Sequence, residues 1–158
     1  MRLFKALAKM DLIIISFFGL VFFLMDRFFK YQATRGWSSI GSGEYFGWHP
    51  YFNRGVGFGL PVPNVITIFL TIIILSLVAF LFLKQVSGVR YKVLGIFSLS
   101  LIFLGATSNL IDRILFGYVV DYLFVITGYV NMADIMIVVG FSIYLVESNY
   151  KYKITNTK

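Results

Sequence analysis

Four of the seven carboxylates in this 158-residue sequence, Asp26, Asp112, Asp121 and Asp134, lie at the ends of long apolar segments or beside them. If those segments cross a membrane, the four aspartates share one depth, where carboxylates face a bundle interior or a wet cavity. Two aspartates that approach within a few ångström cannot both ionise readily, so one keeps its proton. Such a pair supplies a general base for water and a general acid for a leaving amine. The simpler alternative is that each aspartate only marks a helix boundary.

Polar residues that can neutralise these acids stand close to them in the sequence. Lys30 follows Asp26 by four residues, which places both on one helix face as an ion pair. Arg113 directly follows Asp112, and we expect Arg113 to pair with Asp112 or Asp26 in a structural role. Charges that satisfy one another are tolerated in a medium of low dielectric, whereas isolated charges are costly there.

Other kinds of catalytic group are poorly represented. The chain has no cysteine, which excludes a thiol nucleophile, a disulfide and a thiolate zinc site. The single histidine, His49, stands beside Pro50, and we interpret it as a loop or interface residue rather than a metal ligand. Ser38, Ser39 and Ser42 lack the pattern of a serine nucleophile with a lysine base. Paired carboxylates are the chemistry that the sequence favours.

The composition indicates that these residues are positioned by membrane helices. Hydrophobic residues make up 59% of the chain and charged residues 13%, against about 45–50% and 25% in soluble domains. Two uncharged runs, 65–83 and 93–111, are long enough to span a bilayer, while 12–25 and 135–146 must extend at their ends. The first run lacks the small-residue cleavage site of a signal peptide, so we keep it as a helix. We therefore predict one membrane domain over 1–158, with helices at approximately 8–30, 62–83, 93–113 and 130–150.

Basic residues predict the orientation of this bundle. Nine of the fourteen precede the first helix, lie between the second and third, or follow the fourth, which places both termini in the cytoplasm. The net charge of +7 therefore does not indicate nucleic-acid binding, since no Lys/Arg stripe follows any one element. The external connection at 31–61 contains both tryptophans and seven of the fourteen glycines, a composition typical of turns and short strands.

Five motifs, in order along the chain, resemble those of the lipoprotein signal peptidases, also called signal peptidase II. Each motif is weak alone, but the five together cover nearly the whole chain. They are Asp26–Lys30 (DRFFK), Asn53–Phe58 (NRGVGF), Gly105–Arg113 (GATSNLIDR), Val119–Tyr122 (VVDY) and Asn131–Asp134 (NMAD).

The resemblance implies an aspartic endopeptidase of the bacterial inner (cytoplasmic) membrane, with its active site near the external face. Such an enzyme removes the signal peptide of a prolipoprotein just before a diacylglyceryl-modified cysteine. The resemblance assigns the catalytic pair to Asp121 and Asp134. It assigns dyad-orienting or substrate-binding roles to Asn53, Gly55, Asn109, Arg113 and Asn131, and structural support to Asp26, Lys30 and Asp112.

The resemblance also implies a fold and a set of partners. The fold has four transmembrane helices, and the external loop forms a small β-structured cradle on the outer leaflet that holds the lipidated peptide. The expected partners are the prolipoprotein and membrane phospholipid. No metal or cofactor is expected, and the enzyme is expected to be a monomer.

The chain departs from the family pattern at a few positions. Leu104 and Ser108 stand where the family commonly has glycine, Gly57 stands where it has alanine or serine, and Tyr122 stands where phenylalanine is usual. The segment 122–133 is short. Three other functions stay open: an inactive relative that binds lipidated peptides, a small four-helix transporter, and an assembly factor whose external loop docks a partner. A transporter would need an acid near the bilayer midplane, where none of the four segments has a charge.

Overall fold

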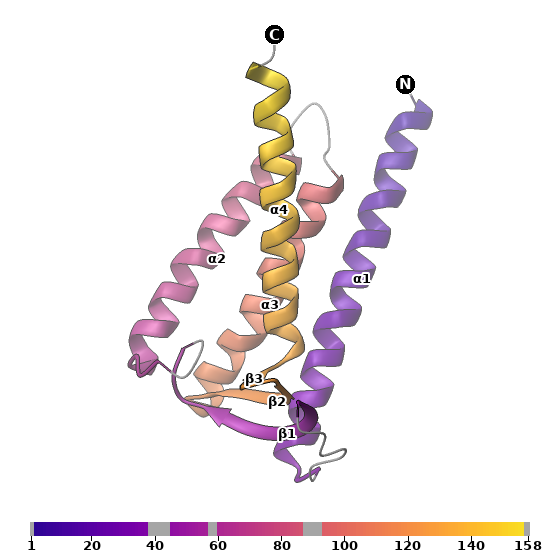
Figure 1. Ribbon diagram of the computed structural model, residues 1–158. Helices are drawn as coiled ribbons and strands as arrows, with labels where there is room; N and C mark the ends of the chain where they lie inside the picture. Colours follow the sequence, from indigo (N-terminus) through magenta and orange to yellow (C-terminus); the bar gives the residue numbers. More distant parts are fainter. Residues whose placement is uncertain (1, 38–44, 57–59, 87–92, 157–158) are drawn as a thin grey trace.

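The computed structural model describes residues 2–37, 45–56, 60–86 and 93–156, and this part of the chain contains four helices (Figure 1). They are α1 (Arg2–Thr34), α2 (Asn64–Val86), α3 (Val93–Phe116) and α4 (Met132–Asn156). All four run between the same two ends of the bundle, and the N-terminal end of α1 and the C-terminal end of α4 lie at the same one (Figure 1).

Each helix ends three to six residues beyond its predicted last residue, and α1 begins six residues before its predicted start. Two helices also begin two residues late. Pro63 lacks an N–H and so precedes α2, and Val130 is used by a strand before α4 begins.

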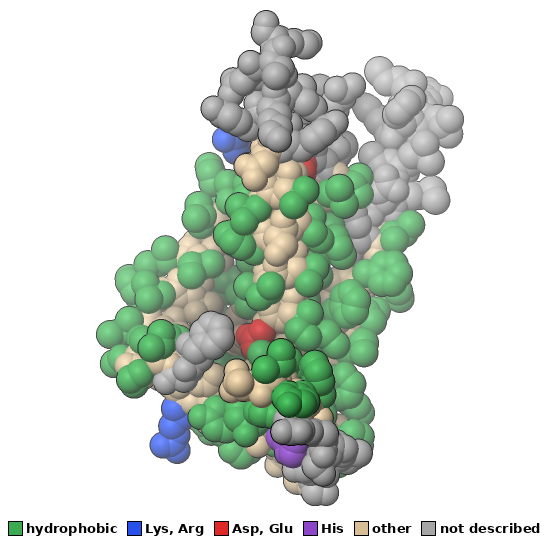
Figure 2. Space-filling view, in the orientation of Figure 1, with side chains coloured by type: hydrophobic (Ala, Val, Ile, Leu, Met, Phe, Trp, Pro, Cys, Tyr) green, Lys and Arg blue, Asp and Glu red, His purple; other side chains and the backbone are tan. Residues whose placement is uncertain are grey.

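Among the described residues, three helices are long and apolar enough to cross a membrane: α2, α3 and residues 132–149 of α4. The side chains of residues 2–13, 15 and 16 of α1 lie outside the described part of the chain, and the helix extends about 50 Å over its 33 residues at 1.5 Å per residue. Large apolar side chains cover the outward helix faces (Figure 2), for example Phe69 at 63% exposure and Val138 at 64%. Such a surface suits contact with lipid better than contact with water.

A three-stranded antiparallel sheet lies at the opposite end of the bundle from the termini (Figure 1). Its strands are β1 (Phe46–Asn53), β2 (Val119–Val125) and β3 (Gly128–Val130), in the order β1-β2-β3. Only β1 comes from the connection in which short strands were expected. The short segment after Asp121 folds as a tight β2–β3 hairpin, which returns the chain directly to the start of α4.

α3 is the central helix and packs against each of the other three. Two of the departures from the family pattern lie on its contact with α1. Leu104 packs over Gly19, where there is no side chain, and the Ser108 hydroxyl donates a hydrogen bond of 2.6 Å to Asp26. The larger side chains are therefore accommodated, one by a glycine and the other by a buried carboxylate. Ser38, Ser39, Ser42 and Gly57 lie outside the described residues.

Aromatic rings attach the sheet to the C-terminal end of α1. Tyr122 on β2 stacks on Trp48 of β1, with ring centroids 5.0 Å apart, and contacts Phe29 of α1 at 5.5 Å. His49, which was expected to be a loop or interface residue, lies within β1, with its ring edge-on to Phe124. This aromatic layer packs β2 against α1, and β2 contains one of the predicted catalytic residues.

Candidate active site

Asp121 lies in the middle of β2 with only 1% of its surface exposed. Asn53 is paired with Val119 across the sheet, so its side chain is the diagonal neighbour of Asp121 on the same face. The Asn53 amide Nδ2 donates to Asp121 Oδ2 at 3.1 Å, and Asn131 Nδ2 donates to Asp121 Oδ1 at 2.6 Å. The carboxyl group therefore has a donor on each oxygen although it is buried.

Asp134 is the third residue of α4, where a carboxylate can accept hydrogen bonds from the free N–H groups of the helix start. Its Oδ2 accepts the N–H of Asn131 at 3.3 Å, and its own N–H donates to Asn131 Oδ1 at 2.9 Å. This reciprocal cap fixes the side chain at the first turn. Asn109 of α3 completes the set, donating from Nδ2 to Asp134 Oδ1 at 2.8 Å.

Asn131 connects the two carboxylates directly. It is fully buried, its side chain donates to Asp121, and its backbone donates to Asp134. Burial, followed by the charge of Asp134, raises the pKa of Asp121 to about 7, against which the hydrogen bonds from Asn53 and Asn131 act. Such a pair keeps one proton near neutral pH.

A buried ionic network lies behind the pair. Lys30 Nζ contacts Asp26 at 3.3 Å and Asp112 at 2.8 Å, and donates to Asn109 Oδ1 at 2.6 Å. The predicted pairing of Asp26 with Lys30 is thus confirmed. Arg27, which the sequence interpretation left without a role, forms a 2.6 Å ion pair with Asp112. The charges of the two cations and the two carboxylates therefore offset the cost of burying them. Through its hydrogen bond to Asn109 Oδ1, Lys30 also fixes the orientation of the Asn109 amide.

The predicted pairing of Arg113 with Asp112 or Asp26 is wrong. Its guanidinium donates to the Gly55 carbonyl at 2.7 Å and to Asn64 Oδ1 at 3.4 Å. Successive residues on a helix point about 100° apart, so Arg113 faces the β1–α2 connection while Asp112 faces α1. Arg113 thus holds the segment that follows Asn53.

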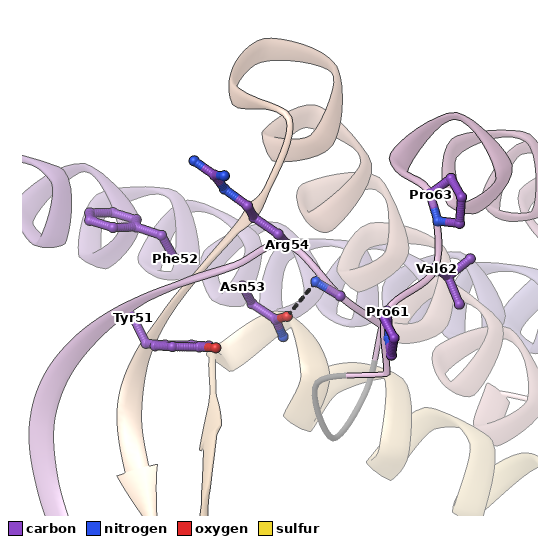
Figure 3. A pocket seen from close by; sticks show the side chains of 8 residues that line it. Tyr51, Phe52, Asn53, Arg54, Pro61, Val62 and Pro63 are labelled. Carbon is purple, nitrogen blue, oxygen red and sulfur yellow. Dashed lines mark hydrogen bonds between the residues drawn. The ribbon is translucent and has the colours of Figure 1, made fainter.

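Gly55 acts through its backbone. Its N–H donates to Asn53 Oδ1 at 2.9 Å (dashed line in Figure 3), and its carbonyl accepts from Arg113. Arg54 extends away from Asn53 (Figure 3) and is exposed. The structure thus places all ten predicted site residues in one cluster at the junction of the sheet with the helices.

Two hollows adjoin the pair. One, of about 530 Å³, is formed by residues 51–55 of β1 and the turn after it and by residues 61–63 before α2 (Figure 3), and it includes Asn53. The other, of about 200 Å³, is formed by Val130, Asp134, Ile135, Val138 and Val139. Figure 2 shows an acidic side chain at the surface where α4 meets the sheet, surrounded by apolar groups. An extended peptide and an apolar chain could therefore approach the pair from the surface.

Tyr122 and Ser108 were not identified from the sequence as partners of Asp26, the structural carboxylate behind the pair. Tyr122 is 1% exposed and its hydroxyl donates to Asp26 Oδ1 at 3.0 Å, and Ser108 donates to the other oxygen of the same carboxylate. The only signal was that both depart from the family pattern.

A family model described as Signal peptidase (SPase) II matches residues 18–150 of the chain. The chain belongs to the signal peptidase II family. A curated relative named lipoprotein signal peptidase, from Clostridium novyi (strain NT), is 32% identical over 139 residues, covering 81% of this chain and 90% of the relative. One with the same name from Halothermothrix orenii is 42% identical over 90 residues, covering 56% of this chain and 59% of the relative.

Solved structures support the fold of this signal peptidase II family member. A bacterial membrane enzyme matches 85% of this chain and 90% of its own with a TM-score of 0.70 and 25% identity. Another bacterial membrane enzyme, at 24% identity, has the same fold, with a TM-score of 0.75 over 92% of this chain and 90% of its own.

Proposed function

We propose that this peptidase removes signal peptides from prolipoproteins by aspartic catalysis, with Asp121 and Asp134 as the catalytic pair. The observation that carries the proposal is that one buried residue, Asn131, donates hydrogen bonds to both carboxylates, to Asp121 on β2 and to Asp134 on α4. Family membership favours a peptidase over the transporter and the docking factor that the sequence left open.

The reaction follows from the shared proton. The ionised carboxylate takes a proton from water as the oxygen attacks the scissile carbonyl carbon, and the protonated carboxyl gives its proton to the carbonyl oxygen. The tetrahedral intermediate then expels the amine, which receives the proton first taken from water. As the carbonyl group reforms, the carboxylate that gave its proton to the carbonyl oxygen takes a proton back from a hydroxyl of the intermediate, which restores the pair. The amide NH₂ groups of Asn53, Asn109 and Asn131 keep both carboxylates oriented through these transfers.

The substrate that fits the proposal is a prolipoprotein with a diacylglyceryl-modified cysteine, cut just before that cysteine. The hollow beside Asn53 suits extended peptide backbone, because carbonyl and amide groups border it. The smaller apolar hollow beside Asp134 suits an aliphatic side chain or the start of an acyl chain. We further propose that the enzyme works as a monomer in contact with phospholipid.

The orientation in the membrane is also part of the proposal. α1 would be a fourth span, because it runs alongside the other three helices (Figure 1) and Lys30 neutralises Asp26 near its outer end. Both termini would then be cytoplasmic, and the sheet and the carboxylate pair would lie at the external face of the inner membrane.

The experiment that tests this function is cleavage of a lipid-modified precursor by the purified enzyme in detergent. Asp121→Asn and Asp134→Asn should each abolish turnover, by at least about a thousandfold, because neither amide can accept or donate the catalytic proton. Both variants should still fold, since asparagine keeps the side-chain volume. Wild-type turnover in either variant would remove the dyad assignment.

Asp112→Asn is the matched control for these substitutions. Asp112 is as buried as Asp121, but it pairs with Arg27 and Lys30 and contacts neither catalytic carboxylate. The substitution leaves two cations without their full counter-charge, so thermal stability should fall more than specific activity. Loss of activity at unchanged stability would mean that the roles of the acids are exchanged.

A further inference from the structure

The hydroxyl of Tyr122 lies between a buried carboxylate and the first residue of α4. It donates to Asp26 Oδ1 at 3.0 Å and accepts the backbone N–H of Met132 at 2.9 Å. We propose that Tyr122 is a positioning residue that holds the first turn of α4, and with it the Asp134 carboxylate, at the correct distance from Asp121. This inference rests on the proposed function.

The first turn of a helix has N–H groups without partners inside the helix, and their satisfaction fixes where the helix begins. In α4 the N–H of Met132 binds Tyr122, that of Ala133 binds Asp26 Oδ1 at 3.2 Å, and that of Asp134 binds Asn131. Two of these three acceptors belong to the Tyr122–Asp26 pair. The start of α4 is therefore held mainly by a hydroxyl from β2 and a carboxylate from α1.

Tyr122 is adjacent to Asp121 in β2, and successive strand residues point to opposite faces of a sheet. One face of the strand therefore presents the Asp121 carboxylate to Asn53 and Asn131, while the other presents the Tyr122 ring to Trp48 and α1. The same short piece of backbone thus places one catalytic carboxylate and holds the helix that bears the other. The separation of the two carboxylates is set through this strand.

Phenylalanine at position 122 would keep the ring contacts with Phe29 and Trp48 but would remove the hydroxyl. The Met132 N–H would lose its acceptor, and the first turn of α4 would be held by fewer bonds. Because small displacements of reacting groups reduce rate more than affinity, we expect Tyr122→Phe to lower kcat roughly tenfold and to change KM by less than about twofold. If the Asp121 and Asp134 carboxylates lie farther apart, their mutual repulsion is weaker and the upper pKa of the pair falls. The decrease of kcat at high pH should therefore move to lower pH.

Ser108→Ala is the matched control. It removes a hydrogen bond of 2.6 Å to the other oxygen of Asp26 and one of 3.4 Å accepted from Arg27, and neither of these bonds involves a backbone group of α4. The full chain, purified in detergent, would be compared with both variants by kcat, KM, the pH profile and thermal unfolding, with a lipid-modified precursor as substrate. Ser108→Ala should lower the unfolding temperature while kcat stays within about twofold of wild type.

The outcomes separate positioning from stability. Wild-type kcat and pH profile in folded Tyr122→Phe, or failure of this variant to fold while Ser108→Ala folds, would show that the hydroxyl serves folding alone. An equal loss of kcat in both variants would assign the effect to Asp26 rather than to the hydroxyl. Asp121→Asn, measured in the same assay, reports on the proposed function separately, and full activity there would overturn the catalytic pair and this inference with it.

Discussion

The three amide side chains at the carboxylate pair share one arrangement. In each, the amide oxygen accepts a hydrogen bond from a fixed donor: Gly55 N–H for Asn53, Lys30 Nζ for Asn109, and Asp134 N–H for Asn131. The oxygen cannot exchange places with the NH₂ group without losing that bond, so each NH₂ group is directed at a carboxylate. The amides therefore stabilise negative charge on the pair without contributing a charge of their own.

This arrangement predicts how the pH dependence changes when one amide is removed. The hydrogen bond from Asn53 favours ionised Asp121 and so lowers a pKa that burial has raised to about 7. Asn53→Ala removes this effect, and the pKa should rise further. Because the reaction needs one proton on the pair, kcat falls as the pH passes the upper pKa, and in the variant this fall should move to higher pH by about one unit.

The measurement is kcat against pH for wild type and Asn53→Ala in the same detergent. Ser142→Ala is a suitable control, because its hydroxyl donates to the Val138 carbonyl within α4, away from the pair. Its profile should coincide with that of wild type. A shift of the Asn53→Ala limb toward lower pH would contradict the stated role of the amide.

Side-chain chemistry could be predicted from the sequence only where partners are close along the chain or share a motif. The Asp26–Lys30 pair is of this kind, since a spacing of four residues determines it. Arg27 and Arg113 are not, because their partners lie on other elements and depend on how the helices are rotated. The hydrogen bonds of Tyr122 could not be predicted for the same reason, since its partners Asp26 and Met132 lie 96 and 10 residues away in the sequence.

At the level of elements, α3 and α4 approach so closely that their backbones meet at two glycines. A Cβ on Gly105 would lie 2.6 Å from the Ala133 carbonyl oxygen, and one on Gly140 would lie 2.6 Å from the Ser98 carbonyl oxygen. Small residues allow such contact between membrane helices, where van der Waals packing replaces the hydrophobic effect as the main attraction. The contact near Ala133 also fixes the height of α4 beside the site.

Gly140→Ala tests this packing far from the catalytic pair. The added methyl group meets backbone, which cannot rotate away, so the helices must separate at a cost of about 1–3 kcal/mol. The unfolding temperature in detergent should fall by several degrees. Gly128→Ala is the control, because no atom lies within 4 Å of its added Cβ, and an equal effect of both substitutions would contradict close packing as the cause.

The helices could be predicted because an apolar run of membrane length is a local signal. The sheet could not, because β1 pairs with β2 across about seventy residues of sequence, for example Tyr51 with Asp121. A short connection between α3 and α4 gave no sign that it would form two strands. This long-range pairing is what brings Asn53 to Asp121, so the site depends on the part of the fold that a single sequence conceals.

At the scale of the whole molecule, the polar groups are segregated by depth. The buried carboxylates, amides and cations gather where the sheet meets the helices, and the chain termini lie at the other end (Figure 1). Basic residues in the sequence flank the end that bears the termini. Both distributions support an orientation with the termini in the cytoplasm and the sheet outside.

Cysteine labelling can test this orientation without background, because the chain has no cysteine of its own. Arg35 and Lys84 are exposed at opposite ends of the bundle, Arg35 just after α1 and Lys84 in the last turn of α2. A membrane-impermeant maleimide should modify Arg35→Cys in intact spheroplasts but Lys84→Cys only after the membrane is permeabilised. An epitope tag before residue 1 should likewise become accessible only after permeabilisation, because α1 must then cross the bilayer between the tag and Arg35.

Phe69→Cys is the control, because the exposed Phe69 side chain lies on the apolar surface of α2 and should stay unmodified throughout. Labelling of Lys84→Cys from outside would reverse the orientation and place the carboxylate pair on the cytoplasmic side.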